Sequence, residues 1–135
     1  MKTHQFNDTQ MACGTLLLAV AEANERLETV EYSAIQDILS DFLHLSPTET
    51  QELLEVCKDQ RKLITGLFES GKILNHTFDL ETKLDFIHCI YEVGYSDGSL
   101  HHLEDFIIKR IANILHIEQA DLIDARIEVR RWFAD

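Results

Sequence analysis

The stretches VAEANERLETVE at residues 20–31 and VGYSDGSLHHLE at residues 93–104 share a pattern from which the fold can be predicted. They agree at a valine, an Asn/Asp, a leucine and a glutamate, which are the pairs Val20 and Val93, Asn24 and Asp97, Leu27 and Leu100, and Glu31 and Glu104. After a one-residue slip, residues 41–45 (DFLHL) also match residues 113–117 (NILHI). Each half is therefore predicted to hold a core helix, a short polar loop and an amphipathic helix, followed by another helix. Since one helix pair cannot bury its apolar faces alone, we expect two such units to pack around a pseudo-twofold axis.

The composition around these stretches favours helices throughout. The chain has one proline and five glycines, and its apolar residues recur at three-to-four spacing with no evident strand-like alternation. The sequence predicts an all-α bundle of about six to seven helices. We expect a polar N-terminal segment at residues 1–8 and a single domain at residues 9–135, with repeat halves at about 9–70 and 79–135.

Several helix boundaries can be predicted from local signals. Residues 46–49 (SPTE) place a capping serine before a first-turn proline and a glutamate at the third helical position, which is a strong helix start. Asp79 is expected to cap a later helix. Gly71 is predicted to end the preceding helix, with residues 72–78 as a loop. The hydrophobic helix at about residues 9–23 and the helix after Asp79 should both pass through the core.

The charge of the chain limits its partners. Its 24 acidic and 12 basic side chains give a formal net charge of −12, which repels phosphate backbones and anionic membranes. We therefore expect no nucleic-acid partner, and cations or basic partners instead. The three cysteines lack a CxxC pairing, and no apolar run approaches the roughly 20 residues of a membrane span. These features predict a cytoplasmic protein without direct membrane insertion.

At the paired stretches the sequence resembles the TerB-like family, named for tellurite-resistance protein B, whose members are all-helical. Residues 95–100 (YSDGSL), Glu104 and residues 111–117 (IANILHI) follow the family pattern closely. The first half keeps Ala23, Leu27 and Glu31, but has Asn24-Glu25 where Asp-Gly is expected. The resemblance runs from about Met11 to Ile127. It implies an association with stress response, acidic metal-binding surfaces in some members, and no established catalysis.

The second paired stretch looks like the back half of an EF-hand calcium loop, with Gly98 at the sharp turn and Glu104 at the closing position. The front half is missing, because Val93 and Tyr95 occupy the first and third ligand positions. A looser divalent-cation site remains, built from Asp97, Glu104, Asp105, Glu22, Asn24, Glu28 and Glu31. The structural alternative is that Asp97-Gly98 forms a turn and that Glu104 or Glu31 caps a nearby helix.

A zinc site would need other residues, and none of the candidates has a recognised spacing. His101 and His102 could combine with His88 and Cys89. However, adjacent His101 and His102 are expected to point in divergent directions, and Cys89 is more simply a core residue. No Gly-rich phosphate loop, nucleophile elbow or triad can be found, so the sequence predicts a protein that is not an enzyme.

Two functions remain open. The preferred one is a non-enzymatic stress-response adaptor that offers an acidic surface to a protein partner or a membrane-associated complex. Clusters such as Glu22, Glu25, Glu28 and Glu31, or Glu49, Glu52 and Glu55, would form that surface or simply solvate exposed helix faces. The alternative is a metal-binding or metal-handling protein in which the acidic inter-helix loops are the functional site.

Overall fold

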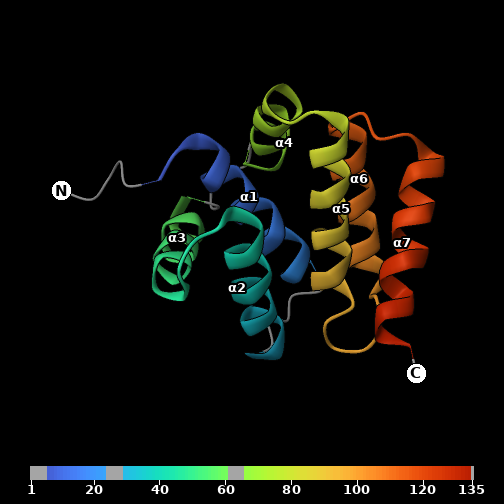
Figure 1. Ribbon diagram of the computed structural model, residues 1–135, viewed down its shortest axis with the longest axis horizontal. Coiled ribbons are helices and arrows are strands. Elements are labelled where there is room, and N and C mark those ends of the chain that lie inside the picture. The colour runs from blue at the N-terminus through green and yellow to red at the C-terminus, as the bar shows by residue number, and fades with distance from the viewer. Residues whose placement is uncertain (1–5, 24–28, 61–65, 135) are drawn as a thin grey trace.

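The computed structural model describes residues 6–23, 29–60 and 66–134, and within these ranges it contains seven helices and no strand (Figure 1). The helices are α1 (Asp8–Ala21), α2 (Thr29–Leu43), α3 (Pro47–Gln60), α4 (Gly66–Thr77), α5 (Leu80–Gly94), α6 (His102–Ile114) and α7 (Gln119–Phe133). The predicted all-α bundle of six to seven helices is therefore confirmed.

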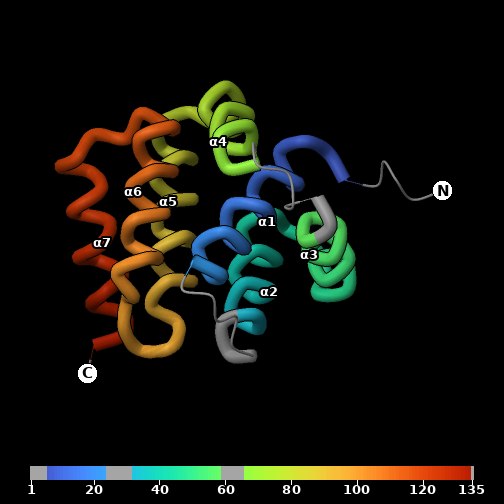
Figure 2. The backbone as a smooth tube through the Cα atoms, turned by 180° about the vertical axis from the view of Figure 1, so that it is seen from behind, coloured from blue at the N-terminus to red at the C-terminus, as the bar shows by residue number. Residues whose placement is uncertain are grey.

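Helix α1 is the central element of the bundle. It is apolar on all sides, and its residues from Ala12 to Leu18 are buried without interruption. Such a helix must be covered on every face. Accordingly α1 packs against α2, α3, α4, α5 and α6, and Figure 2 shows it running between the other helices.

Helix α5 is the second core helix, as the sequence predicts. It packs against α1, α2, α6 and α7, and its side chains Phe86, Ile87, Ile90 and Val93 are completely buried. Helix α7 covers the side of α5 that faces away from α2 and α3 (Figure 1). The face of α5 toward α2 is the one that carries the polar residues described below.

The first helices of the two halves begin with the same type of cap. The side chain of Asn7 accepts a hydrogen bond from the Gln10 amide at 2.8 Å, and that of Asp79 accepts one from the Thr82 amide at 2.8 Å. A side-chain acceptor at this position satisfies an amide that would otherwise lack an intrahelical partner. The cap predicted at Asp79 is confirmed.

The second helices of the two halves end in the same way. His44 and His116, which the sequence pairs, have left-handed backbone conformations with φ of 59° and 61°. In both cases the following amide donates back to a carbonyl oxygen of the helix, that of Ser40 at 3.0 Å and that of Ala112 at 2.9 Å. This is the Schellman arrangement. Helices α1 and α5 thus begin alike, helices α2 and α6 end alike, and each of these pairs of helices is followed by a further helix.

The capping box predicted at residues 46–49 is also present. The Glu49 amide donates to Oγ of Ser46 at 3.1 Å, and the Ser46 amide donates to Oε1 of Glu49 at 3.0 Å. Both amides are satisfied reciprocally, and α3 begins at Pro47 as expected.

The loop predicted at residues 72–78 is wrong, because α4 continues to Thr77 and Gly71 lies within it. Gly71 is needed for packing rather than for ending the helix. A Cβ atom at Gly71 would lie 2.6 Å from Cγ2 of Ile114, on α6. The glycine therefore allows α4 and α6 to approach closely, which local sequence signals do not reveal.

Candidate functional site

The predicted metal ligands at the second loop are engaged in local structure. Asp97 is exposed, its Oδ1 accepts a hydrogen bond from the Ser99 amide at 3.4 Å, and Gly98 has a φ of 110°. The segment is therefore a turn that requires glycine. The carboxylate of Asp97 is exposed at the tip of this turn.

Glu104 and Asp105 point to different partners. Glu104 is completely buried, and its Oε1 accepts a hydrogen bond from the His101 amide at 3.0 Å in the capping box of α6. Asp105 lies between two cations, with Oδ2 3.0 Å from Nζ of Lys109 and 3.7 Å from Nη1 of Arg126 on α7. The structural alternative for Glu104, a helix cap, is thus confirmed.

The first-half ligands are only partly described. Glu22 is the C-cap residue of α1. Asn24 and Glu28, like Glu25 of the acidic cluster, lie outside the described residues, as does the side chain of Glu31. Among the residues that are described, no group of three or more His, Cys, Asp or Glu side chains is placed to hold a metal ion. The inter-helix metal site stays a prediction.

The expected divergence of His101 and His102 is wrong. Their rings stack, with centroids 4.5 Å apart, because His101 is the N-cap residue and has an extended backbone (φ −73°, ψ 145°) rather than a helical one. The His101 ring nitrogen Nδ1 accepts from the Leu103 amide at 3.1 Å. This histidine therefore serves the start of α6.

His88 joins α5 to α7. Its Nδ1 is 2.7 Å from the carbonyl oxygen of Leu84, and its Nε2 is 3.0 Å from Oε1 of Glu128. Since both partners are acceptors, the two bonds form together only when the ring carries both protons. The ring also stacks on Trp132, with centroids 5.9 Å apart.

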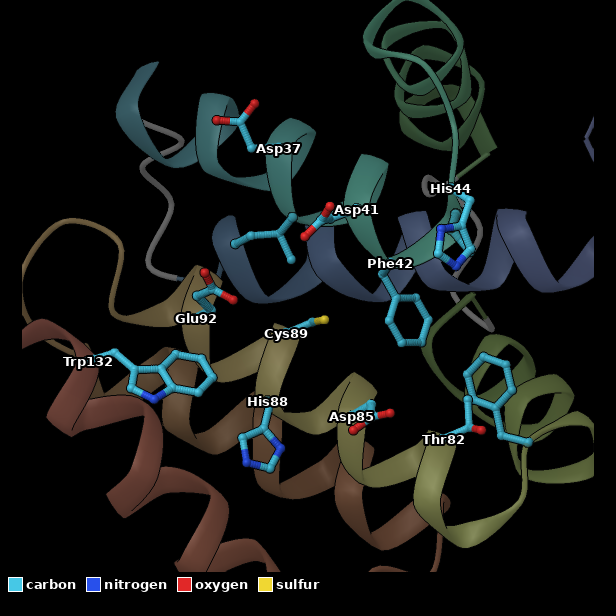
Figure 3. A pocket seen from close by; sticks show the side chains of 13 residues that line it. Asp37, Asp41, Phe42, His44, Thr82, Asp85, His88, Cys89, Glu92 and Trp132 are labelled. Carbon is cyan, nitrogen blue, oxygen red and sulfur yellow. The ribbon is translucent and has the colours of Figure 1, made fainter.

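A groove of about 760 Å³ lies between α2 and α5, with the end of α7 at its edge (Figure 3). Residues at helical spacing form its two walls. Asp37 and Asp41 share one face of α2, and Asp85, Cys89 and Glu92 share one face of α5. We call this feature the α2–α5 groove.

The α2–α5 groove is acidic, although His44 and His88 also line it. Asp37, Asp41, Asp85 and Glu92 form no ion pair with a described lysine, arginine or histidine. Burial and then the charge of Asp41 raise the pKa of the Glu92 carboxyl above its ordinary value. Repulsion between neighbouring carboxylates therefore persists in the folded chain.

Aromatic side chains stand at the two ends of the groove. Phe42 packs against Phe78 and Phe86, with ring centroids 6.0 and 5.5 Å away, at one end. Trp132 is 53% exposed at the other end. Figure 3 shows the carboxylates of Asp41, Asp85 and Glu92 between Phe42 and Trp132. The groove thus offers apolar contacts at its ends and negative charge between them.

The thiol of Cys89 lines the groove but is not an activated nucleophile. Burial, followed by the charges of Glu92, Asp85 and Asp41, raises its pKa to about 12. Because the thiolate is the nucleophilic form, this environment suppresses reactivity at neutral pH. The chemistry available to the groove is binding of cations and apolar groups.

Sequence reasoning missed this groove. One sequence signal does point to the α5 wall of the groove. Asp85 and Glu92 lie seven positions apart, and so on one face, of a helix that is otherwise apolar on two sides. What the sequence did not supply was the pairing of α5 with α2, which brings Asp41 to the same place. The sequence repeat is strongest at the loops and does not mark the residues of the groove.

No helix in the described part of the chain is long and apolar enough to span a bilayer.

Comparisons with known proteins identify the family of the chain. No curated protein and no solved structure matches the chain. The family model described as tellurite resistance protein TerB matches residues 10–127, from the first turn of α1 into α7. Because this match covers most of the chain, the chain belongs to the TerB family.

Proposed function

We propose that this TerB-family chain is a non-enzymatic interaction domain of a stress response, which binds a protein partner through an acidic surface. The partner would be a single protein or a component of a membrane-associated complex. The observation that carries the proposal is the α2–α5 groove, where exposed Trp132 borders carboxylates that form no ion pair with a lysine or arginine in the described part of the chain.

A basic partner would lower the electrostatic free energy of the α2–α5 groove. Clustered carboxylates repel one another, and a basic partner would relieve that repulsion. An exposed tryptophan is the type of residue that contributes most to protein interfaces, because it buries a large rigid surface on binding. Asp41, Glu92 and Trp132 all lie on helices.

A site-specific photocrosslinking experiment in the native host tests this proposal. A photoreactive phenylalanine analogue replaces Trp132 in one variant and Phe106, which is 57% exposed on α6, in a control variant. We expect a defined crosslinked protein from position 132 under tellurite or oxidative stress, and none from position 106. The crosslink should disappear when Asp41→Lys and Glu92→Lys are added. Crosslinks that form equally at both positions, or no crosslink at position 132, would contradict the proposal.

The alternative function is divalent-metal binding at the inter-helix loops, which is favoured by the exposed carboxylate of Asp97 at the tip of the glycine turn. Calorimetric titration of the chelator-treated protein with calcium, magnesium, manganese and zinc tests it. Asp97→Ala is the informative variant, because Glu104 caps α6 and its removal would disturb the fold. Saturable binding that is lost in Asp97→Ala supports this alternative, and unchanged or absent heat counts against it.

A further inference from the structure

We infer that the α2–α5 groove takes a short cationic, amphipathic peptide segment of the partner, with lysine or arginine side chains flanked by apolar ones. This inference rests on the proposed function and names the chemistry of its ligand. It follows from three properties of the groove, which are its charge, its length and the order of its lining residues.

The charge of the groove selects a cationic ligand. Asp37, Asp41, Asp85 and Glu92 line the same cavity without an ion pair to any described cation. An acidic peptide or a phosphate would add to the repulsion already present there. A lysine or arginine side chain between Asp41 and Glu92 would instead oppose two carboxylates from different helices.

The length of the groove suits a short segment. Its wall on α5 runs from Thr82 to Glu92. At a rise of about 1.5 Å per residue, this wall is about 15 Å long. That length corresponds to roughly three turns of a helix laid between α2 and α5, the helix-in-groove mode of recognition.

The order of the lining residues selects an amphipathic segment rather than a polyamine or another purely charged cation. Phe42 and Phe78 stand at one end and Trp132 at the other, with the carboxylates between them (Figure 3). Apolar side chains of the ligand would bury these rings, and a cation near Trp132 would gain a cation–π contact. A ligand without apolar groups leaves both aromatic ends exposed.

Trp132 provides a direct test, because it is the only tryptophan in the chain. The purified full chain is titrated at physiological salt with three probes. The first is a peptide of about twelve residues with leucines in its first and last turns and lysines between them. The second carries serines in place of the leucines, and the third is spermine. Tryptophan fluorescence reports both affinity and the polarity around the ring.

We expect the leucine-containing peptide to shift Trp132 emission to the blue and to bind at least about tenfold more tightly than the serine peptide or spermine. The double variant Asp41→Asn, Glu92→Gln should weaken binding by at least about tenfold. A matched control, Glu55→Gln with Asp124→Asn, removes equal charge from exposed positions on α3 and α7 and should weaken binding less than about twofold.

Three outcomes would overturn the inference. Equal affinity for spermine or the serine peptide would mean that the net charge alone attracts the probes. Equal weakening by the control variant would place the binding outside the groove. Absence of binding by all three probes would exclude a cationic ligand. A photocrosslink at position 132 in that last case would leave the proposed function standing with a partner of different chemistry.

Discussion

His44 and His116 occupy equivalent positions after α2 and α6, and both adopt the left-handed conformation, with φ of 59° and 61°. Side chains with a Cβ atom pay for this conformation by roughly 1–2 kcal/mol, which glycine avoids. We therefore expect His116→Gly to raise the free energy of unfolding by up to about 1 kcal/mol, and His116→Val to lower it by about 1–2 kcal/mol. Urea denaturation measures both. A loss of stability in His116→Gly as large as that in His116→Val would contradict the prediction.

Gly71→Ala is expected to lower the free energy of unfolding by about 1–3 kcal/mol, because the new Cβ would lie 2.6 Å from Cγ2 and 3.2 Å from Cβ of Ile114. These atoms lie close to the backbone of α6 and have little freedom to move. Gly94→Ala is the control, because its Cβ would meet mainly the flexible tip of Leu100, at 2.6 Å. Thermal denaturation should show a larger loss for Gly71→Ala. Adding Ile114→Ala to it should restore part of the loss, and strict additivity of the two changes would contradict the explanation.

These contacts show which parts of the fold the sequence could predict. Caps at Ser46 and Asp79 were predictable, because each is a hydrogen bond within four residues of the chain. The role of Gly71 was not predictable, because glycine serves both to end helices and to allow close packing between them. Only the position of Ile114, far along the chain, distinguishes the two roles.

The candidate site was less predictable than the fold for the same reason. Asp97 and Glu104 stand out in the sequence because they recur, yet the recurrence reflects a turn at Asp97 and a helix cap at Glu104. The α2–α5 groove depends on Asp41 and Glu92 coming together from separate helices. A pattern within one helix places a carboxylate on a face but does not say which helix it will meet.

The three cysteines should resist alkylation in the folded protein. Burial raises the pKa of the Cys57 thiol to about 11, and burial with nearby carboxylates raises that of Cys89 to about 12. The pKa of Cys13 is also raised, mainly by burial. At pH 8 we expect iodoacetamide to label each at least about a hundredfold more slowly than a free thiol, because little thiolate is present. Peptide mass spectrometry measures each site, with urea-unfolded protein as the reference.

The contribution of the groove carboxylates to the raised pKa of the Cys89 thiol can be separated from the contribution of burial. Asp41→Asn combined with Glu92→Gln should speed labelling of Cys89, because these charges raise its pKa, and leave Cys57 unchanged. Labelling of Cys89 at the rate of a free thiol in the unmodified chain would contradict the environment described for the groove. Equal acceleration at Cys57 would indicate loosening of the whole fold instead.

Glu92 should make stability depend on pH in a defined direction. Its carboxyl pKa is raised, first by burial and then by the charge of Asp41, so the folded chain binds this proton more tightly than the unfolded chain does. The stabilisation from the bound proton is complete below the ordinary glutamate pKa and is lost as pH rises through the raised value. Glu92→Gln should therefore increase the free energy of unfolding at pH 7 relative to the unmodified chain. Since the side chain is partly exposed, solvent screening limits the gain to less than about 1 kcal/mol.

Urea denaturation at pH 4 and pH 7 measures this effect, with Asp41→Asn as the companion variant. Removing the charge of Asp41 lowers the pKa of Glu92 toward its ordinary value. The Glu92 carboxyl should then contribute a smaller loss of stability between pH 4 and pH 7 in Asp41→Asn. A loss should remain, because burial still raises the pKa of Glu92. Glu92→Gln should remove the Glu92 contribution entirely. A decrease in stability at pH 7 on Glu92→Gln would show that the carboxylate is favourably paired in the folded chain, and the α2–α5 groove would then lack the uncompensated charge on which cationic recognition depends.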